Sequence, residues 1–194
     1  YYDRQRHEAV FLEHADFLLV PTIFEHYRNQ DRNSALLTCK AKTAKIMGRG
    51  ASFVVAAEQP SDEIRSRYGT PPPMYSAQIN YWLCDIALDL LQHRPDIHHI
   101  YVHTTDYPMH MWSPDAAESR DHMRALDDYL KRTVDLAHDF TIVMTADHGM
   151  NRKTQCWDLA KACGNRGCEL AFAVSPVADR LLKHHRGFGG VSYV

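Results

Sequence analysis

The sequence predicts an α/β fold in which a mostly parallel sheet is flanked by helices. Short apolar runs typical of buried strands recur along the chain, and helical patterns lie between them. Most of these runs are continuously apolar rather than alternating, which is typical of parallel strands that are covered on both faces. The expected strands are 34–38, 52–57, 99–105, 140–146 and 169–175.

Two segments between the expected strands have the periodicity of amphipathic helices, 77–93 and 115–138. In each segment the apolar positions fall on one helical face. They are Ile79, Trp82, Leu83, Ile86 and Leu90 in the first, and Met123, Leu126, Leu130, Val134 and Ala137 in the second. Asp115 is placed to help cap the second helix. The prolines of 70–73 exclude a helix or a central strand there, and they mark a crossover between layers or the edge of a small inserted cap.

Composition narrows the class of protein. The 194 residues suffice for one domain with a core, so we expect a single α/β domain over 1–194, or a large part of a bigger one. The net charge of −2 gives no reason to expect nucleic acid or a membrane surface as a partner. The five cysteines are odd in number and include no CxxC pair, so reduced thiols and a cytoplasmic location are expected. The oligomeric state is left open, with a homodimer as one option.

Two expected strands end in candidate metal ligands. The run 99–105 leads into Asp106, with His110 four residues later, and a turn containing Pro108 would fold His110 back beside Asp106. The run 140–146 leads into Asp147 and His148, and Gly149 permits the unusual backbone angles of a turn that would orient both toward one ion. In a parallel sheet these residues emerge at the same edge, where functional residues gather. Carboxylate oxygen and imidazole nitrogen are both zinc ligands. Each pair by itself also fits an ordinary turn, but two such pairs after two strands favour a metal site.

These residues resemble a known family. The sequences "TTDYPMH" and "TADHGMN" are similar to those of the alkaline phosphatase superfamily, in its phosphodiesterase and nucleotide pyrophosphatase branch, and most similar to the phosphonoacetate hydrolases. Further matches run in the family's order: "YYDRQ", "PTIFEHYRNQ", "LLTCKAKTAKIMGRG" and "HHRGFGGVSYV". The resemblance implies an incomplete alkaline-phosphatase-like core, with part of a small cap as an option.

The resemblance also implies a set of functional residues. Asp106 and His110 would bind one zinc ion, and Asp147 and His148 a second. The nucleophilic Thr of the family is expected upstream of this chain, so no catalytic nucleophile is assigned within it. Lys40 and Lys42, together with His110, would bind the substrate. A lysine ammonium suits a carboxylate or phosphonate.

The activity implied for the complete protein is zinc-dependent hydrolysis of the carbon–phosphorus bond of phosphonoacetate, giving acetate and phosphate. We expect the isolated 194 residues to bind zinc weakly and to turn over little or no substrate. Three alternatives stay open: a related phosphodiesterase or nucleotide pyrophosphatase, a metal-dependent phosphomutase, and a non-catalytic remnant used for binding or assembly. The fold alone does not choose among them.

Overall fold

The computed structural model describes residues 2–10, 14–151, 155, 157–168 and 170. The chain divides into two compact units, of which Glu13–Met150 is the larger and carries the parallel sheet. The other unit comprises Tyr1–Leu12 and Asn151–Val194. It includes an antiparallel pair, β1 (Tyr2–Asp3) with β2 (Glu8–Ala9), and the short helix α7 (Leu159–Gly164). The expectation of a single domain over 1–194 stays a prediction.

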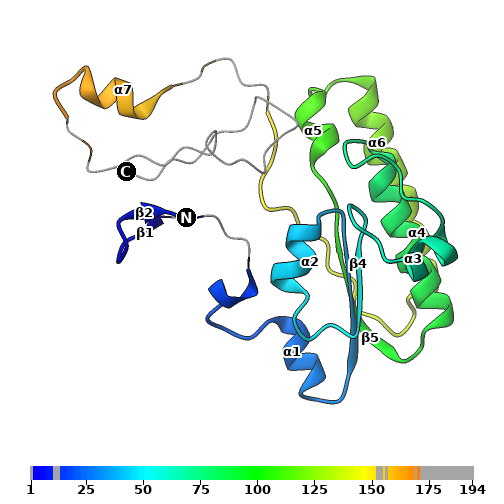
Figure 1. The fold of residues 1–194 in the computed structure, drawn as a ribbon. Coiled ribbons are helices and arrows are strands. Elements are labelled where there is room, and N and C mark those ends of the chain that lie inside the picture. Colours follow the sequence, from blue (N-terminus) through cyan, green and yellow to red (C-terminus); the bar gives the residue numbers. More distant parts are fainter. Residues whose placement is uncertain (1, 11–13, 152–154, 156, 169, 171–194) are drawn as a thin grey trace. The chain divides into compact units, whose positions relative to one another are not determined.

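Three parallel strands form the sheet of the larger unit, in the order β4-β3-β5 (Figure 1). Their bounds are Asn33–Thr38 for β3, Phe53–Ala56 for β4 and Ile97–His103 for β5. Thr38 and His103 are register partners at the carboxyl ends of β3 and β5. The α/β class with a parallel sheet, and the three expected strands at 34–38, 52–57 and 99–105, are therefore confirmed.

Helices connect the strands and cover both faces of the sheet. They are η1 (Ala15–Phe17), α1 (Ile23–Arg28), α2 (Ala41–Met47), α3 (Asp62–Tyr68), α4 (Gln78–His93), α5 (Tyr107–Met111) and α6 (Ala117–Leu136). Figure 1 shows α1 and α2 on one side of the sheet and α4 on the other, with α6 outside α4. A helix between successive strands is what parallel pairing requires, because the chain must cross back over the sheet.

The main core lies between the sheet and α4. Alternate residues of β3 face this helix and pack against its apolar stripe, and the side chains at this contact are buried from solvent. Fully buried members include Ala35, Leu37, Ile79, Leu83, Ile86 and Leu90. The apolar face predicted from the period of 77–93 is thereby confirmed. On the other face, Phe24 of α1 packs against His99 and Tyr101 at ring-centroid distances of 5.9 and 6.3 Å.

Local capping explains where α1 begins. The Thr22 hydroxyl accepts from the Glu25 backbone N–H at 3.1 Å, and the Glu25 carboxylate accepts from the Thr22 N–H at 2.9 Å. This reciprocal pair satisfies two backbone donors that have no partner within the helix. The helix therefore starts at a position that the sequence itself specifies.

The strand predicted at 140–146 is wrong. This segment forms no strand, and its apolar side chains face solvent, with Val143 83% and Met144 66% exposed. Its apolar, β-branched composition favours a strand, but a strand also needs a hydrogen-bonded neighbour and a cover. Among the described residues, no strand pairs with 140–146 and no element covers its apolar side chains. The strand predicted at 169–175 lies outside the described residues.

Helix α6 differs from its prediction in two respects. Asp115 does not cap it: Ala116 is the N-cap residue and makes no side-chain capping bond. Met123 and Val134 of the predicted apolar face are 53% and 55% exposed. The buried residue of α6 is instead His122, whose Nδ1 lies 2.8 Å from the hydroxyl of Tyr81 on α4.

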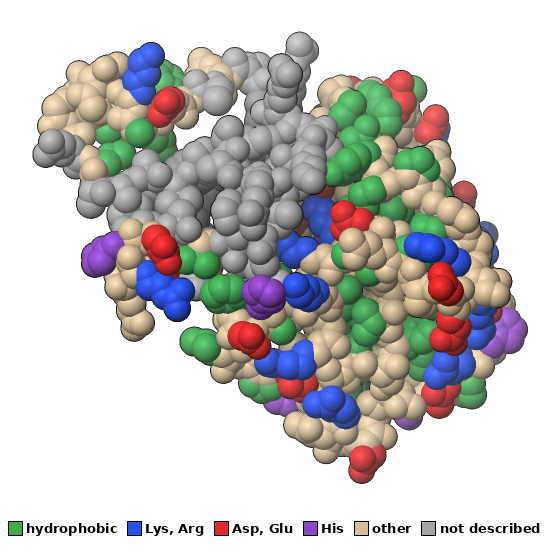
Figure 2. Space-filling model, in the orientation of Figure 1, with side chains coloured by type: hydrophobic (Ala, Val, Ile, Leu, Met, Phe, Trp, Pro, Cys, Tyr) green, Lys and Arg blue, Asp and Glu red, His purple; other side chains and the backbone are tan. Residues whose placement is uncertain are grey.

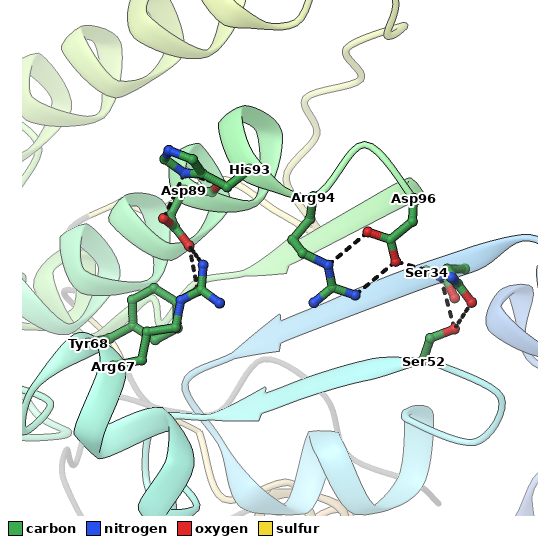
Figure 3. Close-up of polar contacts among 9 residues, drawn as sticks. Ser34, Ser52, Arg67, Tyr68, Asp89, His93, Arg94 and Asp96 are labelled. Carbon is green, nitrogen blue, oxygen red and sulfur yellow. Dashed lines mark hydrogen bonds and ion pairs between the residues drawn. The ribbon is translucent and has the colours of Figure 1, made fainter.

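The amino end of the sheet is fastened by a polar network (Figure 3). Arg94 donates two hydrogen bonds of 2.8 Å to the carboxylate of Asp96. Asn33 donates to Asp96 at 3.2 Å and accepts from the Ser52 hydroxyl at 3.1 Å. These contacts join the first residue of β3 to the segments that enter β5 and β4.

A second cluster in Figure 3 joins α3 to α4 around Asp89. Its carboxylate accepts from the Tyr68 hydroxyl at 2.6 Å and from Arg67 at 2.7 Å, and lies 3.0 Å from His93 Nδ1. Burial, then the hydrogen bond and charge of Asp89, raise the pKa of Tyr68 to about 12. Tyr68 therefore stays a neutral donor that ties the two helices.

The surface carries mixed charge. On the face in Figure 2, Lys and Arg side chains lie among Asp and Glu side chains rather than in a patch of one sign. In the described part of the chain, we find no helix with the length and apolar character needed to cross a membrane.

Candidate active site

Asp106 and His110 meet just beyond the carboxyl end of β5. Asp106 is the N-cap residue of α5, and the fixed φ of Pro108, the second residue of the helix, suits the first helical turn. One helical turn brings His110 Nε2 to 2.9 Å from Asp106 Oδ2. The predicted return of His110 to Asp106 is confirmed, while their role as metal ligands stays a prediction.

Asp106 is held as a carboxylate. Burial is the largest single influence on its pKa and raises it, but the charge and hydrogen bond of His110 together with the charge of Lys40 outweigh burial. The pKa of Asp106 therefore lies below its ordinary value. An ionised, half-buried oxygen beside an imidazole nitrogen is a donor pair that suits a divalent cation.

Asp147 and His148 form a second, more exposed pair. The His148 backbone N–H donates to Asp147 Oδ1 at 2.9 Å, and His148 Nε2 lies 3.7 Å from Asp147 Oδ2. Their side chains are 87% and 54% exposed. Gly149 was expected to supply an unusual backbone angle, but it is not among the glycines with positive φ. The backbone bond within the pair orients the two side chains instead.

His103 is a further polar residue at this edge of the sheet, and sequence reasoning missed it. It is the last residue of β5, and its Nδ1 lies 3.0 Å from the hydroxyl of its register partner Thr38. That hydroxyl already accepts from the Lys40 backbone N–H at 3.2 Å, so its own proton is available to the imidazole. Strand parity was the available signal, because His99, Tyr101 and His103 alternate onto one face.

The charges of several predicted site residues act on the pKa of His103. Burial lowers its pKa most, and the charge of Lys40 lowers it further, whereas the charges of Asp106 and Asp147 raise it. The net pKa is below the ordinary value, so the imidazole is neutral at neutral pH. One lysine and one carboxylate from each pair thus act on the same side chain at the carboxyl edge of the sheet.

Lys40 and Lys42 lie where β3 runs into α2. Lys40 is the half-buried N-cap residue of α2, and its charge also acts on Asp106. Lys42 is half-buried in the first turn of the same helix. The start of α2 is capped by Glu58, whose carboxylate accepts from the Ala41 N–H at 2.9 Å. The structure thus brings Lys40 to the site, and the role of both lysines in binding substrate stays a prediction.

The chemistry of the two pairs fits zinc. Each supplies a carboxylate oxygen and an imidazole nitrogen, which are ligands of zinc in catalytic sites. Within the ranges that the structure describes, however, no three His, Cys, Asp or Glu side chains come together as a metal site. Each pair by itself supplies fewer ligands than the four of a tetrahedral zinc site, and its role in binding zinc stays a prediction.

Comparisons with known proteins agree with this architecture. The chain is similar to the phosphonoacetate hydrolase of Sinorhizobium meliloti 1021 in two crystal structures. In the complex with phosphonoacetate the match has 25% identity and a TM-score of 0.79, and it covers 93% of this chain and 49% of that one. In the complex with phosphonoformate it has 26% identity and a TM-score of 0.62, and it covers 70% of this chain and 37% of that one.

The chain therefore spans about half or less of the length of the solved chains that it matches. A model of the family of type I phosphodiesterases and nucleotide pyrophosphatases matches residues 4–176, which include both Asp-His pairs and the two lysines. Because this match extends over most of the sequence, the chain belongs to the type I phosphodiesterase / nucleotide pyrophosphatase family.

Proposed function

We propose that a complete protein containing this chain is a zinc-dependent hydrolase that cleaves the carbon–phosphorus bond of phosphonoacetate, giving acetate and phosphate. The observation that carries the proposal is the Asp106–His110 pair, 2.9 Å apart at the carboxyl edge of the sheet, with the charge of Lys40 acting on it. The similarity to phosphonoacetate hydrolase over 93% of the chain supports the choice of reaction.

The proposal assigns metal binding to the two Asp-His pairs and substrate binding to the lysines and His110. Asp106 and His110 would hold one zinc ion, and Asp147 and His148 the other. When bound, zinc supplies a Lewis acid at the phosphoryl oxygens. Lys40 and Lys42 would hold the substrate carboxylate, with His110 also at the substrate. An ordered carboxylate matters, because the electron pair of the broken bond delocalises into that carboxyl group.

A second candidate function is cleavage of a phosphodiester or nucleotide pyrophosphate. It is favoured by the family match, whose description names these activities. The same donor pairs would serve both reactions, so the difference lies in what the rest of the cleft binds. In this reading Lys40 meets a phosphate rather than a carboxylate.

A substrate panel tests the proposal. The purified complete protein is loaded with zinc, and phosphate release from phosphonoacetate is compared with nitrophenol release from a nitrophenyl phosphodiester. We expect Asp106→Asn to lower phosphate release by about 100-fold or more, because a neutral amide is a poor ligand for a cation. Asp96→Asn is the matched control, since the same change at the opposite end of the sheet should leave activity within about two-fold.

Each outcome has a meaning. Faster cleavage of the diester would replace the proposal with the second candidate. Phosphate transfer without net hydrolysis would identify a phosphomutase. An intact fold with neither zinc binding nor turnover would indicate a remnant used for binding or assembly.

We propose the same setting for the protein as its sequence suggests: a small phosphonate substrate, no nucleic acid or membrane partner, and the cytoplasm. Support for the last comes from Cys39, Cys84, Cys163 and Cys168, which are free thiols in the described part of the chain. A homodimer remains the assembly to test, by measuring the mass in solution.

A further inference from the structure

A buried asparagine on α4 forms two hydrogen bonds with the backbone of the residue before Asp106. Asn80 Nδ2 donates to the carbonyl of Thr105 at 2.9 Å, and Asn80 Oδ1 accepts from the N–H of the same residue at 2.8 Å. Asn80 is 0% exposed and Thr105 is 2% exposed. The carboxamide thus pairs with both backbone groups of Thr105, as a neighbouring strand would.

The hydrogen bonds of Asn80 connect α4 with the segments that follow β3 and β5. Asn80 Oδ1 also accepts from the thiol of Cys39, the residue after β3, at 3.3 Å. Burial raises the pKa of that thiol to about 12, so it stays a protonated donor. Asn80 therefore ties the end of β3 and the exit of β5 to the most deeply buried helix of the core.

The hydrogen bonds between Asn80 and Thr105 also restrict the position of Asp106. Thr105 is joined to it by one planar peptide unit, and fixing both the N–H and the C=O of Thr105 leaves little freedom in where Asp106 begins. The Thr105 hydroxyl adds a bond of 3.3 Å from the Tyr107 N–H, across the start of α5. The short helix α5 then sets the return of His110 to Asp106.

We propose that Asn80 is a positioning residue for the first zinc pair: it holds the Asp106–His110 turn in the geometry that binds the ion. The proposal rests on the proposed function, because it concerns the zinc that Asp106 and His110 would hold. It assigns no chemical step to Asn80, which lies in the core and touches only protein. Supporting contacts around metal ligands commonly change metal affinity by about 10–100-fold when they are removed.

A zinc competition titration on the complete protein tests this. Asn80→Leu removes both bonds to Thr105 while roughly keeping the volume, and we expect it to weaken zinc binding by about 10-fold or more. Leu83→Ala, on the same helix and also fully buried, is the control. It destabilises the fold but leaves the two hydrogen bonds between Asn80 and Thr105 in place, so zinc affinity should stay within about three-fold of the unsubstituted protein. Asn80→Ser, too short to span the bonds, is the second variant if the leucine variant does not fold.

A metal-free readout separates positioning from general loss of stability. Hydrogen exchange of the segment 105–111, compared at matched global stability, should be at least about 10-fold faster in the Asn80 variant than in the Leu83 variant. Equal exchange and equal zinc affinity in the two variants would overturn the inference and leave the proposed function intact. Failure of the unsubstituted protein to bind zinc would overturn the proposed function, and the positioning role with it.

Discussion

Two buried hydroxyls on β3 differ in whether they have a hydrogen-bond partner, and this predicts opposite effects of removing them. Ser34 and Thr38 are both 0% exposed and lie on the same face of the strand. Thr38 Oγ1 accepts from the Lys40 N–H and lies 3.0 Å from His103 Nδ1. Ser34 Oγ is buried without a partner among the described residues.

The structure sets the size of the two effects. A buried polar group without a partner costs about 1–3 kcal/mol, and its removal abolishes that penalty. Ser34→Ala should therefore leave the free energy of unfolding unchanged or raise it by about 1 kcal/mol. Thr38→Val keeps the shape of the side chain but leaves the Lys40 N–H and the His103 nitrogen without this hydrogen-bond partner. It should therefore lower the free energy of unfolding by about 1–3 kcal/mol.

Urea unfolding of both variants beside the unsubstituted protein measures the difference, with unchanged m-values as the check that only stability has changed. In a thermal scan each 1 kcal/mol corresponds to about 2–4 °C for a chain of this size. The reasoning is refuted if Ser34→Ala destabilises as much as Thr38→Val. That result would mean that the Ser34 hydroxyl has a partner of its own.

Three further predictions follow from individual contacts. Burial lowers the pKa of His99 and of His122, so the unfolded chain takes up protons first as pH falls; stability present at about pH 7.5 should decline below about pH 6.5, as seen by urea unfolding across pH. Asp89→Asn removes the charge that helps to raise the pKa of Tyr68 to about 12, so an ultraviolet titration should show this tyrosine ionising at lower pH; an unchanged midpoint would contradict that account. In the complete protein with the proposed activity, Lys40→Met should raise the KM for phosphonoacetate by about 10-fold or more while changing kcat less, because the proposed attraction between the ammonium and the substrate carboxylate is lost.

The strands and main helices of the core could be predicted from the sequence, because their signals are local. The buried run of β3 and the apolar stripe on α4 reflect the burial that a covered parallel sheet imposes. The run 140–146 carries the same signal, yet it is exposed. A strand is defined by its neighbours, and local composition does not report whether a neighbour is present.

The candidate site shows the same division. The pairing of Asp106 with His110 followed from four residues of spacing and a proline, because one helical turn closes that distance. The presence of His103 beside Thr38 depended on the register of two strands that are 65 residues apart in sequence. The contact of Asn80 with Thr105 depended on how α4 packs across the sheet.

The sequence by itself determined the fold class, the family resemblance and the candidate metal ligands, because residue type and local spacing carry that information. Only the tertiary structure decided which side chains surround Asp106 and which of the expected strands form. Those contacts join segments far apart in the chain, and packing of the whole unit brings them together.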